Sequence, residues 1–360
     1  MPGLFPDGRI PVLNSENSSL RFSRRQVACL VVHQFLRTLS VPSWRDDDGT
    51  HDFGIWYSSQ QRHPDAVRAY LRALMLYFRD VVCEDVQMED WVVEYSLHSL
   101  PERYEEIAAE DRPLSELKVL VVERYDTRPA SLGVGDGDGQ AVVISANKVV
   151  GFGQSATQEE VHVGISPEAC PIVLFTPPLG DEQVLKVCGA QAMVNIVGKG
   201  RDISVGDFEI PQRDSDTAWK FRTMLFMDAL ELDLEHDGER LADLTLENME
   251  RETAKAYTAF CSTTLSEIHT GLWGCGAFGG DPEVKMLLLW LAASMAGLKL
   301  TVVCDNELQT FAQELEAVGQ MLKHIMSGTV SMKKGLMEIP QTLSRGQTLD
   351  WLKKRSQLDS

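Results

Sequence analysis

The spacing of apolar and polar residues changes along this chain near residue 115. Before that point apolar residues recur at helical spacing, most regularly in 22–36 (FSRRQVACLVVHQFL) and 64–82. A Ser stands at the cap position of the first run, and the apolar residues of the second fall on one face. We therefore expect residues 1–112 to form an all-helical region.

Beyond residue 112, short apolar runs alternate with longer amphipathic ones. This alternation predicts a mixed sheet covered by helices over residues 113–340, followed by a polar tail at 341–360. The predicted strands are 117–123, 141–150, 161–165, 171–175, 192–197, 268–271 and 298–304, and the predicted helices are 216–232, 247–260, 282–296 and 307–325.

Two adjacent carboxylates follow the apolar run 141–150 (AVVISANKVV). The intervening residues GFGQSAT are typical of a turn, so Gln158, Glu159 and Glu160 come where an α/β sheet binds its ligand. Burying a carboxylate is costly unless the group is paired or used in function. Taken alone, the same three residues would more often be the solvated start of a helix or strand. Their surroundings decide between the two interpretations.

A second glycine-rich segment, 271–281 (GLWGCGAFGGD), lies directly before the helix predicted at 282–296. Its five glycines allow backbone N–H groups to point inward without obstruction by a Cβ. Asp281 can cap the helix, and Pro282 suits its first position. A strand, a glycine-rich turn and a helix N-terminus together favour a diphosphate-binding element over a simple tight turn.

Composition narrows the class of protein. Of the 360 residues, 44% are hydrophobic and 24% charged, as in soluble globular proteins. The formal net charge of −19 argues against binding to duplex nucleic acid, although a local glycine-rich loop can still bind an anion. The apolar stretch 286–296 is too short to span a membrane, and the N-terminus lacks the order of a signal peptide. We therefore expect an intracellular protein with no membrane contact.

We expect no metal and no cofactor. The seven cysteines form no CxxC pair, and without a secretory signal we expect them to be reduced. The segment 133–139 (GVGDGDG) contains Asp136 and Asp138 but lacks the remaining ligands of a calcium loop, so a turn is the better interpretation. His33 is expected to be a core histidine rather than a ligand.

The two glycine-containing segments, in this order and roughly 120 residues apart, resemble the poly(ADP-ribose) glycohydrolase family. Its hallmark is a Gly-Gly-Gly loop followed by Gln-Glu-Glu, which the segment from Ala146 to Glu160 resembles. The run 273–281 (WGCGAFGGD) is similar to the second signature of the family nearly residue for residue. Weaker similarity at 22–28 and 255–260 extends the resemblance over nearly the whole chain. It implies a macrodomain-like α/β core behind an N-terminal helical accessory region.

The resemblance also implies residue roles. Glu160 would be the general acid and base that cleaves the ribose–ribose O-glycosidic bond and releases ADP-ribose, and Glu159 would position the ribose. Asn147 would orient the site. No metal or cofactor is required. The remaining implied substrate-binding residues are Gly151, Gly153 and Gln158 in the first loop and Cys275, Gly276, Ala277, Phe278 and Gly279 in the second.

The sequence departs from the family in the first loop and around the adenine. Phe152 stands where the family has its middle glycine, and only the four residues 154–157 separate the glycines from Gln158. The tyrosines of the family are missing from 189–200, where Met193, Ile196 and Lys199 stand instead. Val303 replaces an adenine-stacking Phe, and Leu272 replaces an Asn.

Three functions are therefore compared. The leading one is a glycohydrolase acting on poly(ADP-ribose) or ADP-ribosylated proteins, as a monomer in the nucleus or cytoplasm. The second is a non-catalytic ADP-ribose-binding module, favoured by the altered first loop. The third is a hydrolase of mono-ADP-ribosyl adducts. Retention of Glu159 and Glu160 favours an enzyme, because a binding module gains little from a desolvated acid.

Overall fold

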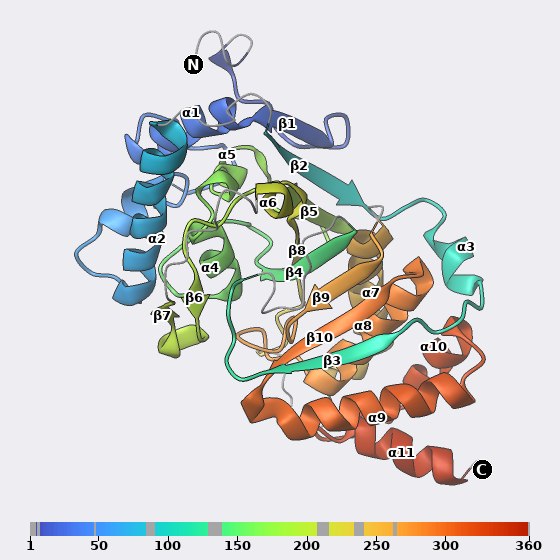
Figure 1. Ribbon diagram of the computed structural model, residues 1–360. Coiled ribbons are helices and arrows are strands. Elements are labelled where there is room, and N and C mark those ends of the chain that lie inside the picture. Colours follow the sequence, from blue (N-terminus) through green and yellow to red (C-terminus); the bar gives the residue numbers. More distant parts are fainter. Residues whose placement is uncertain are drawn as a thin grey trace.

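A mixed eight-stranded sheet forms the centre of the computed structural model (Figure 1). The structure describes residues 5, 8–46, 48–83, 91–128, 139–206, 216–233, 241–261 and 265–358. The predicted turn around Asp136 and Asp138 lies outside these residues. The strands are β1 (Ser19–Ser23), β2 (Val92–Ser99), β3 (Leu117–Val122), β4 (Gln140–Ala146), β5 (Gln183–Cys188), β8 (Thr223–Asp228), β9 (Glu267–Thr270) and β10 (Lys299–Asp305).

The strand order is β1-β2-β5-β8-β4-β9-β10-β3. The five strands from β8 to β3 run parallel to one another, whereas β1, β2 and β5 pair antiparallel with their neighbours. The carboxyl ends of the parallel strands therefore share one edge of the sheet, which is where such sheets bind ligands. A separate ribbon pairs β6 (Ile196–Val197) with β7 (Ser204–Val205).

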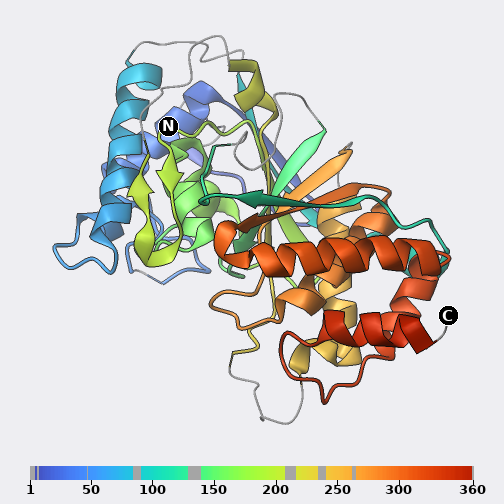
Figure 2. The same cartoon turned by 60° about the horizontal axis from the view of Figure 1, so that its bottom comes forward.

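Helices cover both faces of the sheet, as Figures 1 and 2 show from two directions. The blue and green helices lie on one side and the orange and red ones on the other. The first group is α1 (Arg24–Phe35), α2 (Pro64–Tyr77), α4 (Gln158–Gly164) and α5 (Ile172–Phe175). The second group is α7 (Leu246–Cys261), α8 (Pro282–Ala296), α9 (Gln309–Ile325), α10 (Thr329–Met337) and α11 (Thr348–Leu358); the short helices α3 (Tyr104–Ala109) and α6 (Asp216–Phe221) lie in connections.

Alternating residues of the central strands pack into two separate hydrophobic cores. In β4, Val142 and Ile144 pack with the N-terminal helices, while Ala141 and Val143 pack with the helices α7 and α8. Successive side chains of a strand point to opposite faces, so a strand covered on both sides reads as one continuous apolar run. The macrodomain-like α/β fold predicted from the sequence is thereby confirmed.

Several parts of the secondary-structure prediction were wrong, among them two confusions of strand with helix. The run 161–165, predicted as a strand, forms the C-terminal half of α4 and the residue after it. The run 171–175, also predicted as a strand, contains the helix α5. The predicted helix 216–232 contains only the short helix α6, after which the chain forms the fully buried strand β8. Both errors arise because short apolar runs have no clear period, and tertiary packing then decides the conformation.

The N-terminal region is built into the sheet. Ser23 caps α1 through a capping box with Gln26, as the sequence indicated. The same region also supplies the strands β1 and β2, which the prediction of an all-helical segment did not include. Arg24 at the start of α1 forms a buried ion pair with Glu168, whose carboxylate also accepts a bond from the Gln191 amide. The accessory helices are therefore fixed to the core by both backbone and charge.

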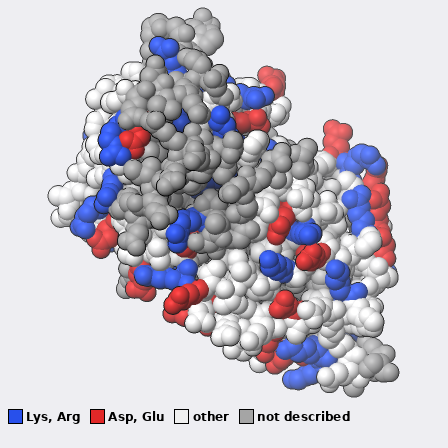
Figure 3. Space-filling model, in the orientation of Figure 1, with Lys and Arg blue, Asp and Glu red and all other residues white. Residues whose placement is uncertain are grey.

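The C-terminal segment also differs from the prediction, because 341–360 contains the helix α11 rather than only a polar tail. On the face shown in Figure 3, basic and acidic side chains are interspersed over the described residues. No helix among the described residues is long and apolar enough to cross a membrane.

Candidate active site

The two loops singled out in the sequence meet at the carboxyl edge of the sheet. The first loop follows β4 and the second follows β9, and these two strands are paired in parallel. A Cβ placed on Gly271, the first residue of the second loop, would lie 3.9 Å from Nε2 of Gln158. Gln158 also accepts a bond from the amide of Ser145 in β4 at 2.9 Å, so the start of α4 is fixed at this edge.

Glu159 is buried and accepts hydrogen bonds from two backbone amides of the first loop. Oε2 is 3.0 Å from the Asn147 nitrogen, and Oε1 is 2.8 Å from the Gly151 nitrogen. Burial raises the pKa of Glu159 to about 8, against the two amides and the charge of Arg45, which lower it. In the structure this carboxyl therefore shapes the loop.

Glu160 is half-buried and occupies the third position of α4. Its Oε2 accepts bonds from the amides of Ser155 at 2.6 Å and Thr157 at 3.3 Å, while the Thr157 hydroxyl accepts a bond from the Glu160 amide. These bonds complete a capping box, so the expectation of a helix start was also correct. Burial raises the pKa of Glu160, which favours the protonated form that a general acid needs.

The backbone around Glu160 is tightly constrained. Gly153 lies so close that an added Cβ would be 2.1 Å from Oε1 of Glu160. Ala156, in the shortened linker, has a φ of 57°, a left-handed conformation that non-glycine residues rarely adopt. The short linker thus brings Glu160 against the glycine, at the cost of local strain.

A buried polar chain behind Gln158 was not found from the sequence. The Gln158 amide donates to the Tyr125 hydroxyl at 3.4 Å, and that hydroxyl lies 2.9 Å from Nε2 of His162. On its other side, Nδ1 of His162 lies 3.3 Å from Arg222. Burial and Arg222 lower the pKa of His162 to about 3, so this histidine is neutral. Its position in a short helix gave no sequence signal beyond one His among apolar residues.

Three backbone amides of the second loop have no hydrogen-bond acceptor among the described residues. Gly276 and Ala277 are exposed and Phe278 half-buried. Among the described residues, none accepts a hydrogen bond from the N–H groups of these three. Gly274 and Gly279 have φ values of 72° and 71°, and the five-glycine composition permits these left-handed conformations. Free amides at a glycine-rich turn can bind an anion.

Buried charges support this loop from below. The Trp273 indole donates to the Met227 carbonyl at 2.9 Å, and its ring centroid lies 5.2 Å from Nζ of Lys285. Lys285 forms a buried ion pair with Glu252. Next to it, Lys255 pairs with Asp228 at 2.5 Å. The resemblance at 255–260 included this lysine, but its partner on β8 could not be predicted.

The departures from the family have structural counterparts. The Phe152 ring packs away from the loop, at 4.9 Å from the Trp56 ring and 5.5 Å from the Phe53 ring. Lys199 forms an ion pair with Asp305 at the carboxyl end of β10. Val303, on that strand, is buried. These replacements place aliphatic and charged groups where the resemblance implied aromatic ones.

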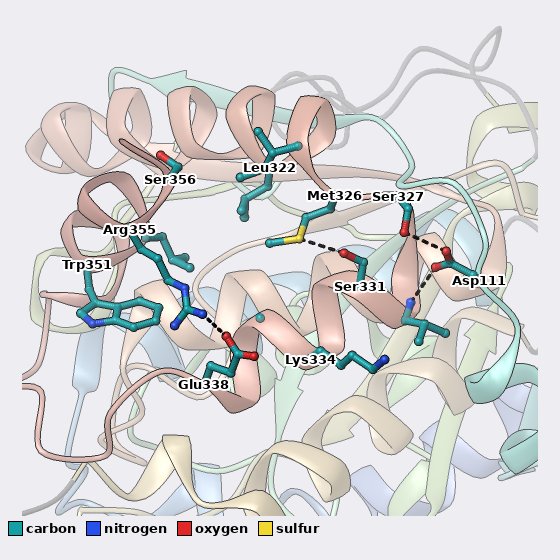
Figure 4. Close-up of a pocket in the computed structure, with 14 residues that line it drawn as sticks. Asp111, Leu322, Met326, Ser327, Ser331, Lys334, Glu338, Trp351, Arg355 and Ser356 are labelled. Atoms are coloured by element: carbon teal, nitrogen blue, oxygen red, sulfur yellow. Dashed lines mark hydrogen bonds and ion pairs between the residues drawn. The ribbon is translucent and has the colours of Figure 1, made fainter. Parts of the chain in front are cut away.

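One cavity of about 500 Å³ lies elsewhere, between α9, α10 and α11 (Figure 4). Its lining includes the ion pair between Glu338 and Arg355, with the Arg355 guanidinium over the Trp351 ring. None of the predicted site residues lines it. Among the described residues, no group of three His, Cys, Asp or Glu side chains could hold a metal ion.

Comparison with known proteins extends these observations. Residues 117–311 match a family profile described as poly(ADP-ribose) glycohydrolase, macro domain fold, and residues 1–96 match its helical domain. A probable poly(ADP-ribose) glycohydrolase 2 of Arabidopsis thaliana is 24% identical over 176 residues, which are 39% of this chain and 34% of that protein. Poly(ADP-ribose) glycohydrolase 1 of Caenorhabditis elegans is 27% identical over 166 residues, 42% of this chain and 21% of that protein.

Among the solved structures similar to this chain are also poly(ADP-ribose) glycohydrolases. The poly(ADP-ribose) glycohydrolase of Thermomonospora curvata is 15% identical, with a TM-score of 0.38, and the alignment covers 82% of this chain and 98% of that one. The enzyme of Deinococcus radiodurans in complex with ADP-ribose is 16% identical, with a TM-score of 0.36 and coverage of 64% and 95%. The matched segment spans about a third or less of the two curated relatives.

Proposed function

This chain belongs to the poly(ADP-ribose) glycohydrolase family, and on that premise we propose that it hydrolyses the ribose–ribose O-glycosidic bonds of poly(ADP-ribose). The observation that carries the proposal is the position of Glu160. Its half-buried carboxyl lies against Gly153 at the carboxyl edge of the sheet, and its pKa is raised by burial. The second loop, whose first residue Gly271 approaches Gln158 at the start of α4, would bind the diphosphate.

In the proposed reaction Glu160 donates its proton to the 2′-oxygen of the departing ribose. The bond between that oxygen and the anomeric carbon of the terminal ribose breaks, and the anomeric carbon develops oxocarbenium character. The resulting Glu160 carboxylate then takes a proton from water, whose oxygen bonds to the anomeric carbon. The products are free ADP-ribose and a chain shortened by one unit, and Glu160 is again protonated.

Glu159 would hydrogen-bond a ribose hydroxyl through its remaining lone pairs. Two backbone amides already hold this carboxyl in one orientation, so little freedom is lost when substrate binds. Asn147 and Gly151 then act through their amides, by fixing Glu159.

A non-catalytic ADP-ribose-binding module is the second candidate, and a specific observation favours it. Oε2 of Glu160 is engaged by the amides of Ser155 and Thr157, and Phe152 packs its ring into the accessory region. Such a loop could bind the diphosphate while its carboxyl serves only as a helix cap.

The test is to incubate the protein with poly(ADP-ribose) and, separately, with mono-ADP-ribosylated protein, and to measure released ADP-ribose. A Glu160→Gln variant, which keeps size and polarity, is assayed alongside. We expect release from the polymer by the original protein and a loss of at least about a hundredfold in the variant. Release from the mono-adduct alone would change the substrate class, and binding of ADP-ribose without any release would establish the binding module instead.

A further inference from the structure

Side chains of the accessory region donate hydrogen bonds to backbone carbonyls of the first loop. Nη2 of Arg45 donates to the Val150 carbonyl and Nε donates to the Val173 carbonyl at 3.0 Å. Nε1 of Trp56 donates to the Gly153 carbonyl at 2.9 Å. Both donors lie far from the loop in sequence: Trp56 belongs to the short 3-10 helix Phe53–Tyr57, and Arg45 precedes that helix. Two carbonyls of the site loop are thus held from the accessory side.

The Arg45 contact reaches Glu159 through one peptide unit. The carbonyl of Val150 and the amide of Gly151 belong to the same planar peptide group, so they point in opposite directions. Arg45 binds the carbonyl, and Glu159 binds the amide. Fixing one end of this rigid unit therefore fixes the direction from which Glu159 receives its hydrogen bond. The positive charge of Arg45 also lowers the pKa of Glu159, against the larger effect of burial.

The Trp56 contact acts on the next part of the loop in the same way. Its bond to the Gly153 carbonyl directs the amide of Gln154 to the opposite side. The Phe152 ring packs against the Trp56 ring, which is stacked on Phe53 at 4.7 Å with an interplanar angle of 5°. The Phe152 side chain, which stands where the family has its middle glycine, thus anchors the loop to the accessory region.

We propose that Arg45 and Trp56 are positioning residues of the active site, holding the loop 150–154 in the shape in which Glu159 and Glu160 act. The inference rests on the proposed glycohydrolase function. Neither residue touches the reacting atoms; each acts through a loop peptide. No sequence pattern indicated this role, since Arg45 and Trp56 are 105 and 97 residues away from the loop carbonyls that they contact. An altered loop, with Phe152 and a short linker, needs such external support because glycine-rich backbone is otherwise costly to order.

The test compares variants that remove one hydrogen bond and little else. Trp56→Phe keeps an aromatic ring but loses the indole N–H. Its matched control is Trp91→Phe, since Trp91 donates the same kind of bond to the Gly189 carbonyl at 2.7 Å, away from the site loop. Arg45→Gln removes the charge and Arg45→Lys keeps it; Arg68→Gln, on the exposed face of α2, is the control for charge loss.

The expected result is a fall in kcat of about tenfold to a hundredfold for Trp56→Phe and Arg45→Gln, with KM changed much less, because small misplacements of reacting groups cost that much. Arg45→Lys should recover part of kcat. Trp91→Phe and Arg68→Gln should keep kcat near that of the original protein. Equal effects of Trp56→Phe and Trp91→Phe on kcat would overturn the proposal, because they would reflect general destabilisation.

A second measurement does not depend on catalysis. Deuterium uptake of peptides covering 147–157 should rise in Trp56→Phe and Arg45→Gln, while uptake across α8 stays unchanged. Unchanged uptake in the loop for both variants would overturn the inference. If the original protein releases no ADP-ribose yet the loop uptake rises as expected, the glycohydrolase proposal fails and the positioning of the loop stands.

Discussion

Gly153 and Glu160 lie in direct contact: a methyl group added to the glycine would sit 2.1 Å from Oε1 of the carboxyl. Real Cβ atoms do not approach an oxygen so closely, so any larger residue at position 153 must displace the Glu160 side chain or the loop. The glycine at position 153 is therefore what leaves room for the proposed general acid, Glu160, in its observed position.

Gly153→Ala should accordingly reduce kcat for ADP-ribose release by about a hundredfold, because the carboxyl is moved from its position. The matched control is Gly335→Ala in α10, where the added Cβ meets only the flexible end of Met326 at 3.0 Å. Comparable activity in both variants would mean that the Glu160 position in the structure is not the reactive one.

The buried Glu159 should make stability depend on pH. Its folded pKa of about 8 lies above the ordinary value of 4.5, so the folded state holds the proton more tightly than the unfolded state. The contribution is fully present below pH 4.5 and is lost as the pH rises through about 8. Urea unfolding from pH 5 to 9 should show this decline, and Glu159→Gln should remove part of it. An identical slope in the variant would contradict the raised pKa.

The capping box of α4 can be separated from catalysis by a matched pair. Thr157→Ala removes the hydroxyl that accepts a hydrogen bond from the Glu160 amide, and Ser23→Ala removes the equivalent N-cap of α1. Each should lower the free energy of unfolding by about 1 kcal/mol. Only Thr157→Ala should also reduce kcat, since only α4 carries the proposed general acid. Equal losses of activity in the two variants would argue against this link.

The buried ion pair beneath the second loop should be costly to break. Lys285→Met removes the buried cation next to Oε2 of Glu252, while Arg251 still pairs with Oε1 at 2.7 Å, so the free energy of unfolding should fall by about 3 kcal/mol, the lower end of the range for breaking a buried pair. The double variant Lys285→Met, Glu252→Gln should recover part of that loss, because one of the two carboxylates beside the missing cation is then neutral. Denaturant titration of the single and double variants measures both terms. No recovery in the double variant would show that packing rather than charge dominates.

Local chemistry in the sequence predicted some elements well. The helix at 282–296 was placed correctly because Asp281 and Pro282 mark its start by their own conformational preference; in the structure it ends at the left-handed Gly297. By contrast, β8 was taken for a helix, since its residues are buried on both faces and show no alternation. Elements marked by the conformational preference of single residues can be predicted from the sequence. Elements whose pattern depends on which faces are covered cannot.

The candidate site shows the same division. The meeting of Gln158 with Gly271 agrees with the rule that loops after parallel strands share one edge, although the sequence paired the two loops only through the family resemblance. The contributions of Arg45, Tyr125 and His162 were missed, because each depends on a contact between segments far apart in sequence. No local pattern announces such a partner.

The strands β1 and β2 have a consequence for how the protein can be divided. The two family profiles end at residue 96 and begin at residue 117, a boundary that suggests two separable modules. Yet β2 pairs with β5, so the N-terminal segment completes the sheet of the other half. Expressed alone, residues 113–360 would leave β5 as an open edge, a template on which other chains can add strands. Residues 113–360 are therefore not expected to be an autonomous folding unit, and truncation there would produce aggregates rather than a smaller folded protein.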